Sequence, residues 1–194
     1  ISWQYPVVET TTALLFVGSY LYWPLSLNAQ GLTVFVFWLL FLTGFMALLV
    51  YDFKWMLLPD KLVYPLLGLA LLQTVAISVV FHGGLDSLLG AFWGFLIIGG
   101  LFYVLFQVSN GKWIGGGDVK LGMVLGILAG GPIKAILLLF MASLSGAVIS
   151  LLLIASKRLK PNHHIPFGPF LILAAIITQL WGTKLVDLYQ RLFL

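Results

Sequence analysis

The sequence contains no cysteine and few charged residues. Among its 194 residues, ten are Lys or Arg and six are Asp or Glu, so only 8% are charged. The lack of cysteine excludes a disulfide framework and a thiolate metal site within this chain. The low charge leaves no basic, soluble face of the kind that binds nucleic acid, so we expect no nucleic-acid partner.

What the chain has in excess is apolar residues, at 61% against about 45 to 50% in soluble domains. Crossing a lipid bilayer takes roughly 17 to 25 apolar residues. Runs long enough cover residues 7–27, 32–50, 62–81, 88–106, 133–155 and 167–186, and a shorter run covers 121–129. The composition predicts an all-α, polytopic transmembrane bundle of about seven helices. The short segment would be re-entrant or would rest on other helices.

The chain shows no internal repeat and no soluble second domain, so we expect residues 1–194 to form a single transmembrane domain. Its first residue is Ile1, and no basic start or cleavage site precedes Pro6. We therefore expect the remainder of a longer protein and not a chain with a signal peptide.

Basic residues are distributed unevenly between the two sides that seven crossings would create. Seven of the ten share the side of the N-terminus, and basic loops mark the cytoplasmic side. The first side holds Lys54, Lys61, Lys112, Lys120, Lys157, Arg158 and Lys160, and the other holds Lys134, Lys184 and Arg191. This orientation depends on counting the short segment as a crossing.

The same topology places Asp52, Asp60 and Asp118 on one face of the membrane. A carboxylate near lipid is costly unless it is paired, hydrated or functional. Aspartic proteolysis needs two carboxyl groups, one ionised to take a proton from water and one protonated to polarise the peptide carbonyl. Asp52 and Asp118, on different helices at the same depth, would satisfy this need.

Three glycines, Gly115, Gly116 and Gly117, precede Asp118 directly. A backbone without side chains lets a substrate strand approach closely and lets the chain turn sharply. A helix that begins at this turn would also place backbone N–H groups near Asp118, where they favour its ionised form.

Each carboxylate also has a simpler explanation. Asp118 would be an ordinary N-cap after a glycine-rich loop, and Asp52 would be an interfacial residue paired with Lys54. Asp60 would cap the helix that starts near Leu62. The simple explanation is sufficient for Asp60, whereas Asp52 and Asp118 together favour the catalytic interpretation.

Three further features have two interpretations each. Glu9 would lie in the first turn of a helix started by Pro6, stabilised by the helix dipole, or would face a pocket. His163 and His164 lack a third ligand at useful spacing, so we expect a surface loop and no metal site. The segment Pro166-Phe167-Gly168-Pro169 would be a plain helix start or a rigid wall of the active site.

Four stretches, in order, carry a family resemblance. They are the decapeptide Tyr-Asp-Phe-Lys-Trp-Met-Leu-Leu-Pro-Asp at 51–60, Gly-Gly-Gly-Asp-Val-Lys-Leu-Gly at 115–122, Ile-Pro-Phe-Gly-Pro-Phe-Leu at 165–171, and residues 1–6 with Glu9. In these stretches the chain resembles the type IV prepilin peptidases, membrane aspartic proteases of the GxGD class. The resemblance covers essentially the whole chain.

The resemblance implies an endopeptidase of the bacterial cytoplasmic membrane whose active site faces the cytoplasm. It would cleave the basic leader from type IV prepilins or type II secretion pseudopilins after a glycine, without a cofactor, using Asp52 and Asp118. The expected substrate-binding residues are Gly115, Gly116, Gly117, Asp60, Lys120, Pro166 and Gly168.

Many bacterial members of this family also methylate the new N-terminus with S-adenosylmethionine, and they carry a four-cysteine zinc loop preceded by a helix. This chain contains neither the loop nor that helix. We therefore expect S-adenosylmethionine and zinc only in connection with an intact, longer protein.

Two other interpretations of the carboxylates are open. A presenilin or signal peptide peptidase type also pairs Tyr-Asp with Gly-x-Gly-Asp, but lacks the Leu-Leu-Pro-Asp and Pro-Phe-Gly-Pro contexts found here. A small ion or proton-coupled transporter would place carboxylates near mid-membrane, on broken helices in matching halves. Both Asp52 and Asp118 instead fall at one boundary, which favours the enzyme.

Overall fold

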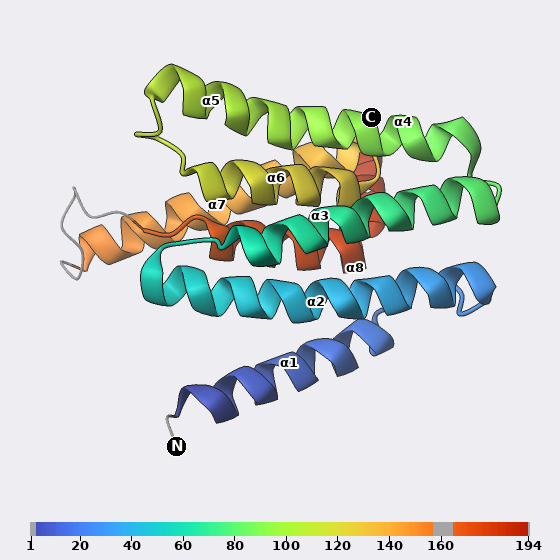
Figure 1. Ribbon diagram of the computed structural model, residues 1–194, viewed down its shortest axis with the longest axis horizontal. Coiled ribbons are helices and arrows are strands. Elements are labelled where there is room, and N and C mark those ends of the chain that lie inside the picture. Colours follow the sequence, from blue (N-terminus) through green and yellow to red (C-terminus); the bar gives the residue numbers. More distant parts are fainter. Residues whose placement is uncertain (1–2, 157–164, 194) are drawn as a thin grey trace.

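The computed structural model describes residues 3–156 and 165–193, and every regular element in these two ranges is helical (Figure 1). The α-helices are α1 (Gln4–Leu21), α2 (Ala29–Trp55), α3 (Asp60–Val75), α4 (Gly84–Phe95), α5 (Leu101–Ser109), α6 (Gly116–Ala129), α7 (Pro132–Ala155) and α8 (Gly168–Phe193). Two π-helical turns, η1 (Ala76–Val80) and η2 (Leu96–Gly100), extend α3 and join α4 to α5. The described chain therefore forms seven continuous helical rods, which confirms the predicted all-α fold.

Five of the rods are long and apolar enough to cross a membrane. They cover Ala29–Trp55, Asp60–Val80, Gly84–Ser109, Pro132–Ala155 and Gly168–Leu192. Helix α6 has only 14 residues, which at 1.5 Å per residue gives about 21 Å, less than the roughly 30 Å of a hydrocarbon core. It contacts α3, α4, α5, α7 and α8 inside the bundle, as predicted for a short segment that rests on other helices.

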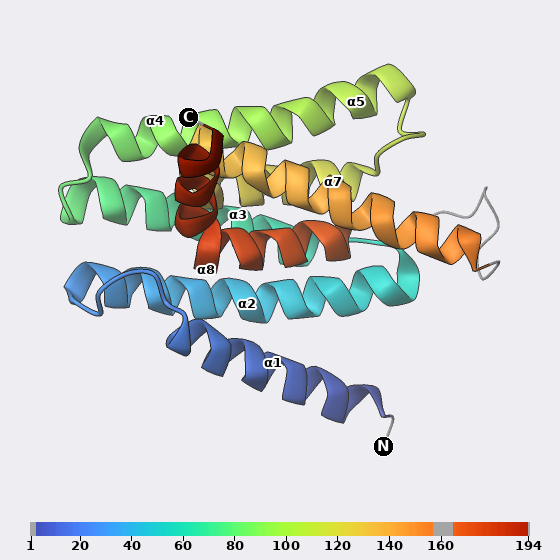
Figure 2. The same ribbon diagram turned by 180° about the vertical axis from the view of Figure 1, so that it is seen from behind.

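The connections gather at the two ends of the bundle. The N-terminus, the α2–α3 connection and the α5–α6 connection lie at one end, and the α1–α2, α3–α4 and α6–α7 connections lie at the other (Figures 1 and 2). We call the first of these the site end, defined by residues 56–59 and 110–115. This grouping agrees with the predicted topology. Lys157, Arg158, Lys160, His163 and His164 lie outside the described residues.

The first helix differs from its prediction at both ends. It covers Gln4–Leu21 and not residues 7–27. It ends early because Pro24 lacks an N–H donor and disfavours the helical conformation of the residue before it. Because the helix starts earlier, Glu9 lies beyond its first turn, and the first turn contains no acidic residue. The dipole explanation of Glu9 was therefore wrong. Glu9 is exposed and lines a cavity of about 410 Å³ between α1 and α2, so it does face a pocket, but this pocket is not the site-end cavity described below.

Helix α6 is held by close backbone contact with α4. A Cβ atom added to Gly94 would overlap the carbonyl oxygen of Gly126, and one added to Gly126 would overlap that of Gly94. Within lipid, helices associate through such close packing of small residues, because the hydrophobic effect does not drive them together. The other face of α6 is buried through Leu121 and Leu125. The first turn of α6, which carries Asp118, is thus part of a fixed element.

Candidate active site

Asp52 lies one turn before the end of α2 and is 5% exposed. The helix ends when Met56 takes the left-handed conformation, with its N–H donating to the carbonyl oxygen of Asp52. The buried Oδ2 atom of Asp52 accepts no hydrogen bond of good geometry from any described residue. Lys54 instead lies 5.5 Å from the centre of the Trp55 ring. The simpler explanation of Asp52, an ion pair with Lys54, was therefore wrong, because helical residues two apart do not face each other.

Gly168, the first residue of α8, is buried against the carboxyl group of Asp52. A Cβ atom added at Gly168 would overlap Oδ2 of Asp52. Any side chain at this position would have to displace the carboxylate. The Pro-Phe-Gly-Pro segment therefore brings the start of α8 directly to Asp52, and a plain helix start does not account for the glycine.

Asp118 is the third residue of α6 and lies in its first turn. The N-cap is Gly115, and it makes no side-chain cap bond. The interpretation of Asp118 as an N-cap was therefore wrong, because the helix begins at Gly116. The Asp118 side chain turns back toward the loop, and its Oδ2 would lie 3.4 Å from a Cβ atom on Gly115. This position near free backbone N–H groups at a helix start favours a negative charge.

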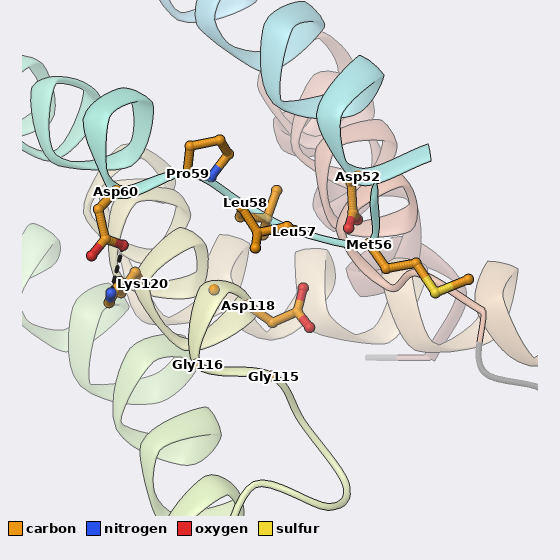
Figure 3. Close-up of a pocket in the computed structure, with 11 residues that line it drawn as sticks. Asp52, Met56, Leu57, Leu58, Pro59, Asp60, Gly115, Gly116, Asp118 and Lys120 are labelled. Carbon is orange, nitrogen blue, oxygen red and sulfur yellow. Dashed lines mark hydrogen bonds and ion pairs between the residues drawn. The ribbon is translucent and has the colours of Figure 1, made fainter. Parts of the chain in front are cut away.

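Asp52 and Asp118 line one cavity of about 450 Å³ at the site end. Figure 3 shows their carboxyl groups turned toward each other from α2 and α6, and the two are close enough for their negative charges to repel. The other lining residues are Met56, Leu57, Leu58, Pro59, Asp60, Gly115, Gly116, Gly117 and Lys120. Residues 66 positions apart in the sequence thus share the site that paired-carboxylate chemistry needs.

Leu58 is a site residue that the sequence analysis missed. It is 7% exposed and packs between α6 and α8, where it would lie 2.9 Å from a Cβ atom on Gly117 and 3.7 Å from one on Gly168. On the side where a Cβ atom of Gly117 would lie, the space is therefore filled by Leu58, although Gly117 still lines the cavity. The sequence feature that could have pointed to Leu58 is its position next to Pro59, in a connection between two helices.

The glycine run does not provide a sharp turn. Among the described glycines, only Gly84, Gly111 and Gly130 have φ in the left-handed region, and Gly115 has an ordinary extended conformation with φ −72°. The predicted need for glycine's conformational freedom at 115–117 was therefore wrong. Gly115 remains exposed at the cavity wall, so a close approach of substrate stays a prediction for this position.

Asp60 and Lys120 form an ion pair at the rim of the cavity, with 2.5 Å between Lys120 Nζ and Asp60 Oδ1 (Figure 3). Asp60 is the first residue of α3, and Pro59 occupies the N-cap position without a side-chain bond. The predicted capping role of Asp60 was wrong, because its carboxylate is drawn to Lys120. Lys120 also lies 5.3 Å from the centre of the Tyr64 ring. The pair ties the start of α3 to the first turn of α6.

A second cavity of about 410 Å³ continues from the first on the side of α8. Both carboxylates line it, and Pro166 and Phe167 contribute its wall. Trp113, which the sequence analysis did not single out, lines this cavity and is 70% exposed. Its backbone N–H donates to Oγ of Ser109 at 3.2 Å. The available signal was an aromatic residue at a membrane boundary, where tryptophan is enriched.

Comparison with known proteins agrees with this geometry. Residues 34–151, which include Asp52 and Asp118, match the model of the type IV leader peptidase family. The chain belongs to this family. No solved structure matches the chain.

Three relatives of this chain carry the name prepilin leader peptidase/N-methyltransferase. The Pseudomonas aeruginosa protein is 33% identical over 97% of this chain and 62% of its own length. The Aeromonas hydrophila protein is 36% identical over 100% of this chain and 64% of its own length. The Bacillus subtilis protein is 29% identical over 100% of this chain and 73% of its own length. The chain therefore spans less than two thirds of the length of the first two relatives.

Proposed function

We propose that the chain carries the proteolytic site of a membrane aspartic endopeptidase that removes the basic leader of type IV prepilins or type II secretion pseudopilins after a glycine. One observation carries the proposal: Asp52, buried and without a hydrogen bond to Oδ2, faces Asp118 across a shared cavity. The family and the names of the relatives supply the substrate class.

The proposed chemistry uses one proton shared between the two carboxyl groups. The ionised carboxylate takes a proton from a water molecule, and the water oxygen attacks the carbonyl carbon of the scissile peptide bond. The protonated carboxyl group gives its proton to the carbonyl oxygen, which yields a tetrahedral diol. The diol then collapses as the C–N bond breaks: one diol hydroxyl returns its proton to the second carboxylate, and the leaving nitrogen takes the proton that the first carboxylate had accepted. The pair is thereby returned to its starting state, with one proton shared between the two carboxyl groups.

The cavity is suited to a small residue at the cut. Its wall is formed by the exposed Gly115 on one side and by Leu58 on the other. We propose that the substrate glycine lies beside Gly115, at the cytoplasmic side of the bacterial inner membrane. Replacement of the substrate glycine by valine would then block cleavage by steric exclusion, whereas loss of leader charges would slow it only modestly.

The family match disfavours the presenilin or signal peptide peptidase alternative. The transporter alternative is disfavoured by the position of both carboxylates at one end of the bundle. The proposal concerns proteolysis. Methyl transfer with S-adenosylmethionine and a zinc loop remain expectations from the resemblance for a longer, intact protein.

The direct test is cleavage of a purified prepilin by the purified chain in lipid nanodiscs. We expect the substrate to lose its leader, and mass spectrometry of the product to place the cut after the glycine. Asp52→Asn and Asp118→Asn chains serve as controls of nearly equal volume. Cleavage by either variant at the unmodified rate would overturn the proposal.

A further inference from the structure

An apolar groove of about 660 Å³ lies between α5 and α7 and ends at Asp118. Its α5 side is formed by Leu101 and Leu105, and its α7 side by Ile136 and Phe140. Leu101, Ile136 and Phe140 are each 45% to 62% exposed. This open apolar surface reaches one member of the proposed catalytic pair, Asp118, and extends away from it along α5 and α7.

The groove exists because α5 and α7 separate toward the site end. Helix α7 packs against α4 and η2, and beyond η2 the two helices diverge, as both views show (Figures 1 and 2). The α7 residues that line the groove run from Ile136 to Ser143, which is about 10 Å of helix at 1.5 Å per residue. The groove is thus long enough to hold about two turns of another helix.

The groove is continuous with the proposed active site. Trp113 and Ile114 line its site end, and the same two residues line the second cavity together with Asp52 and Asp118. The second cavity shares both carboxylates with the first. A segment that leaves the groove past Trp113 therefore arrives directly between the two carboxyl groups.

We propose that this groove binds the apolar transmembrane helix of the substrate, an inference that rests on the proposed function. A leader-bearing substrate presents an apolar helix, then a glycine, then a basic leader. The protein presents matching surfaces for the first two parts in the same order: the apolar groove, then the carboxylate pair with Gly115. Helix-in-groove binding reads apolar anchors spaced along one helical face, and the groove offers room for such anchors.

Photo-crosslinking tests the occupant without relying on cleavage. A benzoylphenylalanine at Ile136, in an Asp52→Asn chain that keeps the substrate uncut, should crosslink to the apolar helix of the prepilin. The matched control is the same probe at Val104, which is 55% exposed on α5 but does not line the groove. Crosslinks to lipid alone, or equal substrate crosslinking from both positions, would overturn the proposal.

A steric variant gives the functional readout. Leu105→Trp fills the groove and should raise KM for prepilin at least tenfold with little change in kcat, while Val104→Trp should change neither. An unchanged KM in Leu105→Trp would overturn the groove proposal even if the unmodified chain cuts prepilin. Failure of the unmodified chain to cut prepilin would instead overturn the proposed function. The two failures are therefore distinguishable.

Discussion

Asp52 and Asp60 are eight positions apart and line the same cavity, yet their surroundings are opposite. Asp52 is 5% exposed, and its Oδ2 lies against the backbone of Gly168 and accepts no hydrogen bond of good geometry from the described residues. The side chain of Asp60 is 52% exposed and paired with Lys120. Burial of an unpaired carboxylate is costly, whereas an exposed ion pair is close to neutral. The contrast indicates that Asp60 is explained by its structural contact and that Asp52 is not.

Amide replacement should separate the two residues most strongly. Asp52→Asn should lower kcat for prepilin cleavage by about 10³-fold or more, because an amide cannot cycle a proton. Asp118→Asn should do the same, and the double variant should be little worse than either single one. The measurement is single-turnover cleavage with helix content checked by circular dichroism. An active Asp52→Asn beside an inactive Asp60→Asn would show that Asp60 is the partner of Asp118.

The dependence of cleavage on pH should sharpen the same contrast. Activity requires one shared proton, so it should fall at low pH, where both carboxyl groups are protonated, and at high pH, where both are ionised. Each limb should lose about tenfold per pH unit, or about 100-fold over two units. The check is kcat/KM across the pH range, with Asp60→Asn as control. A level profile with unchanged substrate binding would contradict the shared proton.

Gly168→Ala tests whether the buried position of Asp52 matters. The new Cβ would overlap Oδ2 of Asp52, so the carboxylate must shift and cleavage should fall about tenfold or more. Gly68→Ala is the matched control, because a Cβ there meets no atom within 4 Å. Comparison of kcat for the two variants decides the question. Equal activity would mean that the position of the Asp52 carboxylate is not restricted by α8.

Breaking the Asp60–Lys120 pair should have the smallest effect. An exposed ion pair contributes about 0.2 to 1 kcal/mol, so Asp60→Asn and Lys120→Gln should each change cleavage by a factor of about five at most. A double-mutant cycle on kcat/KM measures their coupling. A loss of 100-fold in Asp60→Asn with Lys120→Gln unaffected would indicate that Asp60 acts on the substrate directly.

The sequence predicted the helices and the shared location of Asp52 and Asp118, because both follow from the lengths of the apolar runs. Apolar runs fixed the number of rods, and counting crossings placed the two carboxylates at one end. One large boundary error came before Pro24, where the apolar run continues but the helix does not. Length and hydropathy were thus reliable guides to topology, and less reliable guides to where each helix ends.

Side-chain partners were not predictable in the same way. In a soluble helix, the polar face shows which side points outward. The apolar helices of this chain face both lipid and core with similar residues. The sequence therefore does not show which face of each helix, about its own axis, points toward the core. Leu58 between Gly117 and Gly168, and the link between Asp60 and Lys120, depend on that rotation. Both contacts therefore became visible only in the structure.

The contact between Gly94 and Gly126 has a consequence for the order of assembly. A helix of 14 residues is too short to insert stably into a bilayer by itself. Helix α6 therefore needs a docking partner already in place, and the backbone contact with α4 supplies one. Asp118 reaches Asp52 only after this late step. A nascent or partly inserted chain would hold its two carboxyl groups apart, so it could not hydrolyse peptide bonds in its surroundings before the bundle is complete.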